Sequence, residues 1–125
     1  MMSNIIYKEE SYSNVGVLFE VYNNLGSGFS EIVYKDVIEY EFEKLGIPFQ
    51  REKQYKVNYK DIVLPHKFYA DFVVFDKIIL EVKCVENLND KHLAQCINYL
   101  KVSECKLSIL VNFHKDLLHH KRIVL

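Results

Sequence analysis

The chain has 125 residues, half of them hydrophobic, which is enough for one domain with its own core and argues against a disordered or low-complexity chain. Sixteen Lys and Arg residues against seventeen Asp and Glu residues give a net charge of −1, which argues mildly against a protein that grips phosphate backbones by charge alone. Acids clustered to hold cations would weaken that objection, because bound metal ions invert the local field.

The cysteines indicate a reducing compartment. Cys84, Cys96 and Cys105 are odd in number and have no C-x-x-C spacing, so we expect free thiols and not a disulfide framework. No apolar stretch approaches the roughly 20 residues that span a bilayer, and no secretory signal pattern is visible at the N-terminus. We therefore expect a cytoplasmic protein with no membrane partner.

Two helices are predicted in the first part of the chain. Residues 14–24 carry apolar side chains at helical spacing and run into a glycine-rich stop. A second helix is expected from the cap Ser30 to about Leu45, with Gly46 ending it. The apolar stripe of the first helix is Val15, Leu18, Phe19 and Tyr22.

Strands follow, interrupted by one more helix. Alternating residues predict a half-exposed strand at 49–59 that turns at Lys60-Asp61. The third helix should start at Asn89 or Asp90 and reach about residue 104, with Leu93, Ile97 and Leu100 buried. This order predicts an α/β fold, a mixed central sheet of about five strands flanked by three helices. The other expected strands are 62–75, 78–85, 106–112 and 121–125.

Three charged residues interrupt strands that are otherwise apolar. Asp71 lies in the first of these strands, and Glu81 and Lys83 share one face of the next. A buried carboxylate costs several kcal/mol unless it is paired or holds a metal. A two-residue Asp76-Lys77 hairpin would turn Asp71 away from Glu81. We therefore predict a connection with an odd number of residues, or a bulge.

Two helices add polar groups near the predicted core. Glu31 starts the apolar stripe of the second helix, which continues through Tyr34, Ile38, Phe42 and Leu45. On the third helix, His92, Gln95 and Tyr99 form a polar row beside the buried stripe. The row on the third helix could face the same cleft as the acids.

Several of these residues match the pattern of a known family. The segment Gly28-Phe29-Ser30-Glu31-Ile32-Val33-Tyr34 reads G-x-x-E-x-x-Y, and the chain resembles the GxxExxY proteins of the PD-(D/E)XK nuclease superfamily. The resemblance covers nearly the whole chain and implies one domain over residues 1–125 with a restriction-endonuclease-like core. It continues through Tyr69-Ala70-Asp71, Glu81-Val82-Lys83, His92-Leu93-Ala94-Gln95, Asn98-Tyr99-Leu100 and Leu110-Val111-Asn112-Phe113.

The resemblance also implies a chemistry, the hydrolysis of phosphodiesters by water that a metal activates. Asp71, Glu81, the carbonyl of Val82, and Glu31 would bind Mg²⁺ or Mn²⁺, whose preferred ligands are hard oxygens. Lys83 would position the attacking water. Gln95 and Tyr99 would orient phosphate or the site itself, and Tyr34 would support the ligands from behind.

This chain departs from the family pattern at two positions. Ser27 stands where relatives usually have proline, and Tyr69 stands where they often have a basic residue. Neither position holds the metal, so the departure at Tyr69 concerns substrate contact. The implied partner is nucleic acid, with DNA favoured over RNA, and a homodimer would suit the cutting of both strands by so short a chain.

Simpler interpretations remain for each group. Asp71, Glu81 and Lys83 could form a structural ion pair, Glu31 could favour the helix dipole from solvent, and Gln95 and Tyr99 could edge the core. The fold could serve a non-catalytic nucleic-acid-binding or protein-interaction module, or hydrolyse a small phosphoester. A basic cluster near the C-terminus is either a phosphate-binding patch or a solvated face. Its members are His114, Lys115, His119, His120, Lys121 and Arg122.

Overall fold

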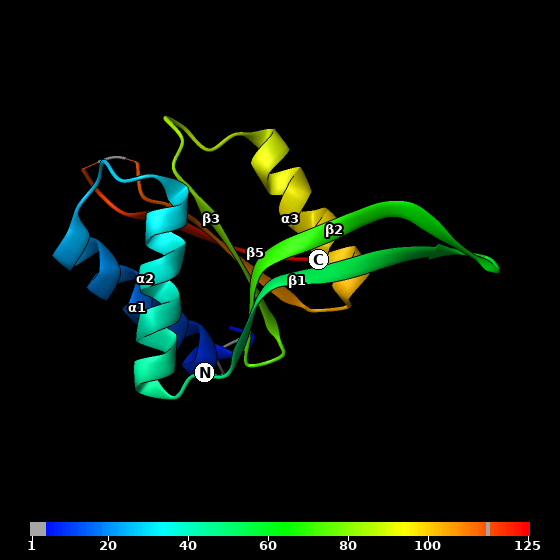
Figure 1. The fold of residues 1–125 in the computed structure, drawn as a ribbon, viewed down its shortest axis with the longest axis horizontal. Helices are drawn as coiled ribbons and strands as arrows, with labels where there is room; N and C mark the ends of the chain where they lie inside the picture. The colour runs from blue at the N-terminus through cyan, green and yellow to red at the C-terminus, as the bar shows by residue number, and fades with distance from the viewer. Residues whose placement is uncertain (1–4, 115) are drawn as a thin grey trace.

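The computed structural model describes residues 5–114 and 116–125, and within them the chain forms three helices and five strands (Figure 1). Each predicted helix and strand is present, although the first helix starts earlier than its apolar pattern indicates. The elements are α1 (Lys8–Leu25), α2 (Glu31–Leu45), β1 (Phe49–Tyr59), β2 (Ile62–Val74), β3 (Ile78–Lys83), α3 (Asp90–Ser103), β4 (Leu107–Asn112) and β5 (His119–Val124).

The strands form one mixed sheet in the order β1-β2-β3-β4-β5. Neighbouring strands are antiparallel except β3 and β4, which are parallel and joined through α3. A parallel pair needs such a crossover because its chain must return to the same end of the sheet. The predicted α/β class with a five-stranded mixed sheet is confirmed, and β3 occupies the centre.

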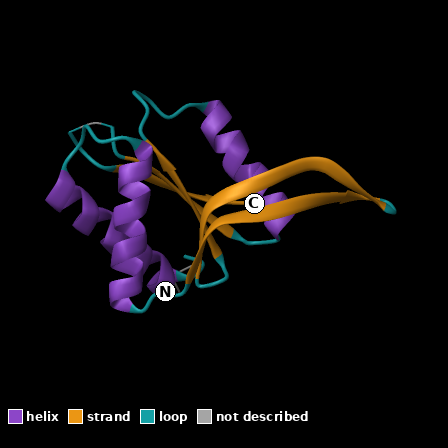
Figure 2. Cartoon of the chain, viewed as in Figure 1, coloured by secondary structure: helices purple, strands orange, loops and turns teal. Residues whose placement is uncertain are grey.

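The helices lie on both faces of the sheet, as Figure 2 shows. Side chains of α1 and α2, among them Leu18 and Ile38, pack in one buried cluster with Leu80 of β3. Tyr99 and Leu100 of α3 form a second cluster with Val73 and Ile79. The sheet is therefore buried on both sides at its centre, which explains the almost continuous apolar sequence of β3 and β4.

Local signals fix the ends of the helices. Gly46 adopts the left-handed conformation at the end of α2, with a φ of 68°, which costs glycine little because it has no Cβ. Asn89 caps α3 by accepting from the amides of Lys91 and His92, and the His92 side chain accepts from the Asn89 amide in return. Ser30 is the cap residue of α2 but makes no side-chain capping bond.

Some predicted stripe residues are exposed. Phe19 and Leu45 are 41% and 61% exposed, and on α3 the most buried side chains are Cys96, Tyr99 and Leu100. Periodicity defines a broad apolar arc of a helix, and packing against the sheet selects which part of that arc is covered. In the part of the chain that the structure describes, no helix combines the length and the apolarity needed to cross a membrane.

Candidate functional site

The two predicted acids converge where the pairing of β2 with β3 ends. The register runs Val74↔Ile78, Val73↔Ile79 and Phe72↔Leu80, and the next positions are Asp71 and Glu81. The connection between the strands has three residues, two of which, Phe75 and Asp76, adopt left-handed backbone angles. The predicted odd-numbered connection is therefore correct, and it brings the acids opposite each other.

At this point of the sheet, backbone amides of the two strands donate to the carboxylates of Asp71 and Glu81. The amide of Val82 donates to Asp71 Oδ2 over 2.8 Å, and the amide of Asp71 donates to Glu81 Oε1 over 3.2 Å. Both residues are buried, with 8% and 2% of their surface exposed. The main chain of each strand thus holds the acid of the other, which fixes both carboxylates without a separate scaffold.

A buried lysine from α2 completes the centre. Lys35 Nζ lies 3.0 Å from Asp71 Oδ1 and also bonds the carboxylate of Glu52 on β1. Lys35 was not among the predicted site residues. The available signal was its position four residues after Glu31 and three before Ile38, which places it on the edge of the buried stripe of the helix.

Burial and the neighbouring acid raise the pKa of Glu81 to about 9, with burial the larger cause. A carboxyl in this setting holds its proton at neutral pH, because two negative charges cannot share a site with little water. A divalent cation would remove that repulsion. The donor set of two adjacent carboxyls and the Val82 carbonyl therefore fits a hard cation such as Mg²⁺, which keeps several waters when it binds.

Glu31 approaches this centre from the first residue of α2. Burial and then Asp71 raise the pKa of Glu31, while Lys83 and Lys35 lower it, so its carboxyl lies within electrostatic range of all three. Within residues 5–114 and 116–125, however, no three His, Cys, Asp or Glu side chains come close enough to hold a metal together. The structure brings Asp71 and Glu81 into direct contact and leaves Glu31 nearby.

Lys83 ends β3 next to the acids and is partly buried. Its charge lowers the pKa values of both Glu81 and Glu31, against the effect of burial. None of the ion pairs among the described residues includes Lys83. Its ammonium group is therefore not committed to a structural bridge, in contrast to that of Lys35.

Tyr99 and Gln95 occupy the α3 side of the site. Tyr99 is only 6% exposed, and its ring meets Phe68 edge to face at 5.8 Å, so it belongs to the core and not to a polar row. Burial raises the pKa of Tyr99 to about 12, and the charges of Glu81 and Asp71 add to this effect. Gln95 is partly exposed on the same helix, one turn before Tyr99.

Tyr34 has a structural role that explains its place in the motif. Its hydroxyl donates to the carbonyl of Gly26 over 2.6 Å and accepts from the amide of Phe29 over 3.4 Å. Its ring stacks on Phe113 with 4.3 Å between centroids. Tyr34 thus ties the glycine loop to the helix that carries Glu31, behind the acids and not among them.

The predicted basic cluster near the C-terminus divides between the two faces of β5. Arg122 donates to Ser11 and to the carbonyl of Ile6, and the ring of His120 meets Phe19, so both pack on the N-terminal segment and α1. His119 and Lys121 point the other way, and Lys115 lies outside the described residues. The cluster therefore does not form one phosphate-binding patch.

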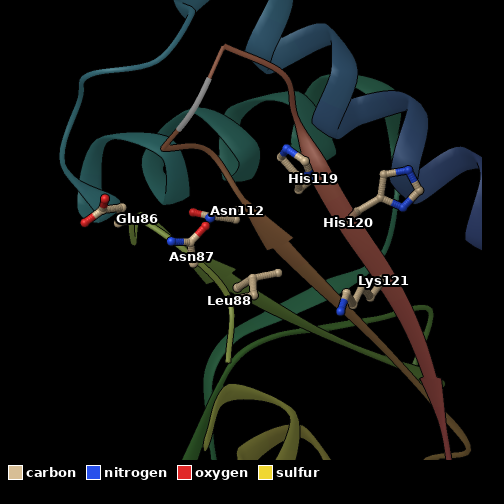
Figure 3. A pocket seen from close by; sticks show the side chains of 7 residues that line it. All are labelled: Glu86, Asn87, Leu88, Asn112, His119, His120 and Lys121. Carbon is tan, nitrogen blue, oxygen red and sulfur yellow. The ribbon is translucent and has the colours of Figure 1, made fainter. Parts of the chain in front are cut away.

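A cavity of about 220 Å³ lies beside the end of β3 (Figure 3). Asn112 closes one wall, because its side-chain amide donates to the carbonyl of Val85 and accepts from the Val85 amide. Asp71 and Glu81 do not line this cavity, so it is separate from the acidic centre. Its lining residues are Glu86, Asn87, Leu88, Asn112, His119, His120 and Lys121.

Fold and site together define a class. A mixed five-stranded sheet flanked by helices, with an acid on each of two diverging strands, is a restriction-endonuclease-like core. A family model of the PD-(D/E)XK nuclease superfamily matches residues 8–123, and the chain belongs to that superfamily. No curated protein matches the chain significantly.

Among solved structures, the chain is similar to the crystal structure of SSO0001, with a TM-score of 0.59 and 19% sequence identity. The similarity covers 94% of this chain and 57% of that one, so the chain spans little more than half the length of SSO0001. At this level of identity the likeness shows the fold alone.

Proposed function

We propose that this protein is a metal-dependent nuclease that hydrolyses phosphodiester bonds in nucleic acid. The observation that supports it best is the pair Asp71 and Glu81, buried against each other with the pKa of Glu81 raised to about 9. A domain without use for this pair would gain stability by replacing it. Membership of a nuclease superfamily points to the same function.

In this proposal Asp71, Glu81 and the Val82 carbonyl hold Mg²⁺ or Mn²⁺, and Glu31 contributes a further ligand from α2. When bound, the cation supplies charge stabilisation at phosphorus and lowers the pKa of a water. Lys83, which forms no structural ion pair with the described acids, orients the attacking water and offsets the developing negative charge. Gln95 orients the substrate phosphate with Tyr99 packed on the same helix, and Tyr34 supports the start of α2, which carries Glu31.

Finer features belong to the same proposal. The GxxExxY resemblance supports a nuclease of that subfamily, with DNA favoured over RNA as substrate. A homodimer would let two single-site chains cut both strands of a duplex. The three free cysteines support a cytoplasmic setting.

One observation favours a second candidate, a non-catalytic module that keeps the fold. Lys35 already neutralises Asp71 and bridges to Glu52, so part of the site carries its own cation. In such a module the Lys35 bridge would replace the metal, and nucleic acid or protein would bind without being cut. Metal binding separates the two candidates.

The test is cleavage of labelled single- and double-stranded DNA and RNA with Mg²⁺ or Mn²⁺. Wild type should cut one of these substrates only with metal, while Asp71→Asn and Lys83→Ala should not. Asp76→Asn is the matched control, because it removes the same charge from the exposed turn between β2 and β3. Wild type that neither cuts any substrate nor binds metal by calorimetry would support the binding module instead.

A further inference from the structure

The β1–β2 hairpin projects beyond the body of the molecule, away from α1 and α2 (Figure 1). Its outer part, residues 53–69, contains four lysines and one aspartate, although the whole chain has a net charge of −1. Positive charge is therefore concentrated on this arm. The net charge of the whole chain does not reveal this local concentration of positive charge.

One face of this arm continues directly from the acidic centre. Glu52 and Asp71 both contact Lys35, which places them on the same side of the hairpin. Residues two apart on a strand share a face, so Tyr69 and Lys67 follow Asp71 outward along β2. On β1 their register partners are Gln54 and Lys56, with Gln54↔Tyr69 and Lys56↔Lys67.

The side chains of this face are open to solvent. Tyr69 is 47% exposed, and Gln54, Lys56 and Lys67 are also exposed. The opposite face is covered, because Tyr55 and Phe68 pack against the cluster around Tyr99. The hairpin is thus held in place from the α3 side and leaves its other side free.

The pairing of Lys56 with Lys67 lowers the stability of the hairpin. Like charges directly opposite each other in an antiparallel pair repel and destabilise the sheet. A polyanion laid across both lysines would turn this repulsion into attraction. An exposed tyrosine beside them offers a ring on which an unpaired base can stack.

We infer that the face formed by Tyr69, Lys56 and Lys67 binds a single-stranded segment of nucleic acid leading into the acidic centre. Tyr69 stacks on a base next to the scissile bond, and the two lysines hold phosphates farther along the strand. From Asp71 to Lys67 is four residues, roughly 13 Å of strand, a distance that a single strand spans in a few nucleotides. The inference rests on the proposed function and names its substrate as unpaired.

Protection of free strand edges is the competing explanation for the lysines. Charged side chains on exposed edges prevent strands of two molecules from pairing. That purpose would not place Tyr69, Ile62 and Val63 in solvent on the same hairpin, where all three are about half exposed or more. It also predicts a different defect when the lysines are removed, namely self-association.

The test measures anisotropy of a fluorescein-labelled single-stranded DNA between about 50 and 200 mM salt, without divalent metal. The double variant Lys56→Gln/Lys67→Gln should flatten the log–log salt slope by about 1.4, at about 0.7 for each phosphate contact of a single strand. Tyr69→Ala should weaken binding roughly five- to a hundredfold and leave the salt slope unchanged. Lys44→Gln/Lys101→Gln, which removes two exposed charges at the ends of α2 and α3, should change neither.

Thermal unfolding and cleavage complete the test. Removing the Lys56–Lys67 repulsion should leave the melting temperature unchanged or raise it, which excludes misfolding as the cause of weaker binding. Unchanged binding in the lysine and Tyr69 variants, or tighter binding of duplex than of single strand, would overturn the inference even where wild type cuts nucleic acid. Weakened binding in the hairpin variants would support the surface even where no cutting is seen, and in that case only the proposed nuclease activity would fail.

Discussion

The amide of Asp71 donates to the carboxylate of Glu81, with 3.2 Å between the nitrogen and Oε1. The main chain of one acid therefore holds the side chain of the other, and the pair is set where β2 and β3 stop exchanging ladder bonds. Lys35, from α2, contacts Asp71 Oδ1, while Asp71 Oδ2 accepts from the amide of Val82.

The stability of the metal-free protein should fall as pH rises from 4.5 towards 9. Glu81 has an ordinary pKa of 4.5 and a pKa of about 9 in the fold, so the folded state holds the extra proton across this range. A state that binds more protons loses stability relative to the other as pH rises. Urea unfolding in the presence of a chelator, measured across this range, checks the slope.

Glu81→Gln should remove most of that pH dependence, because its amide does not ionise. The exposed Glu86 provides the control, and Glu86→Gln should keep the wild-type slope. Excess Mg²⁺ or Mn²⁺ should raise the melting temperature of wild type, and by more at the alkaline end, where proton and metal no longer compete. An equal metal effect at all pH values would contradict a site at Glu81.

Lys35→Met should destabilise the metal-free protein by about 3–5 kcal/mol, since it leaves Asp71 buried with no cation. The two side chains are only 10% and 11% exposed, so water screens the pair little. Lys77→Met breaks the Lys77–Glu10 pair, in which the side chains are 47% and 27% exposed, and should destabilise the protein far less, because water screens this pair. Chemical denaturation of both variants gives the comparison.

Divalent metal should stabilise Lys35→Met by more than it stabilises wild type, because the ion would replace the missing positive charge at Asp71. Calorimetric titration with Mn²⁺ should likewise show tighter binding to the variant. Loss of metal binding in this variant would mean that Lys35 is part of the metal site's scaffold and not its competitor.

Lys83→Met should keep metal binding and lose cleavage. The side chain forms no structural bridge to the described acids, so its removal should change stability little. A group that assists proton transfer or positions water contributes about 10²- to 10⁴-fold to rate. Single-turnover cleavage measures the loss, and Lys106→Met, at an exposed position before β4, should cleave like wild type.

Tyr34→Phe should cost about 0.5–1.5 kcal/mol, the usual net value of one hydrogen bond, because the ring keeps its stacking on Phe113. Its loss frees the glycine loop that precedes Glu31, so cleavage should decline only in part. Tyr40→Phe, with Tyr40 61% exposed, should change neither quantity. Complete loss of cleavage by a stable Tyr34→Phe protein would show that the hydroxyl takes part in the reaction.

Much of the fold could be predicted because its signals are local. The ends of α2 and α3 follow from Gly46 and Asn89, whose backbone and side-chain preferences act within one turn. The start of α1 at Lys8 could not be predicted in this way, since its first turns are polar. Their helical state depends on tertiary packing, in which Ser11 and Asn14 are buried.

The sequence by itself determined that Asp71 and Glu81 had to be compensated, since two carboxyls in buried strands cannot stand alone, and that an odd connection or a bulge had to align them. Only the tertiary structure decided what compensates them. Lys35 comes from 36 residues before Asp71, and Glu52 from the neighbouring strand, so their meeting depends on how α2 lies across the sheet. The charge of the hairpin also depends on tertiary structure. Strand pairing places Lys56 opposite Lys67 and so concentrates positive charge that the composition of the whole chain does not show.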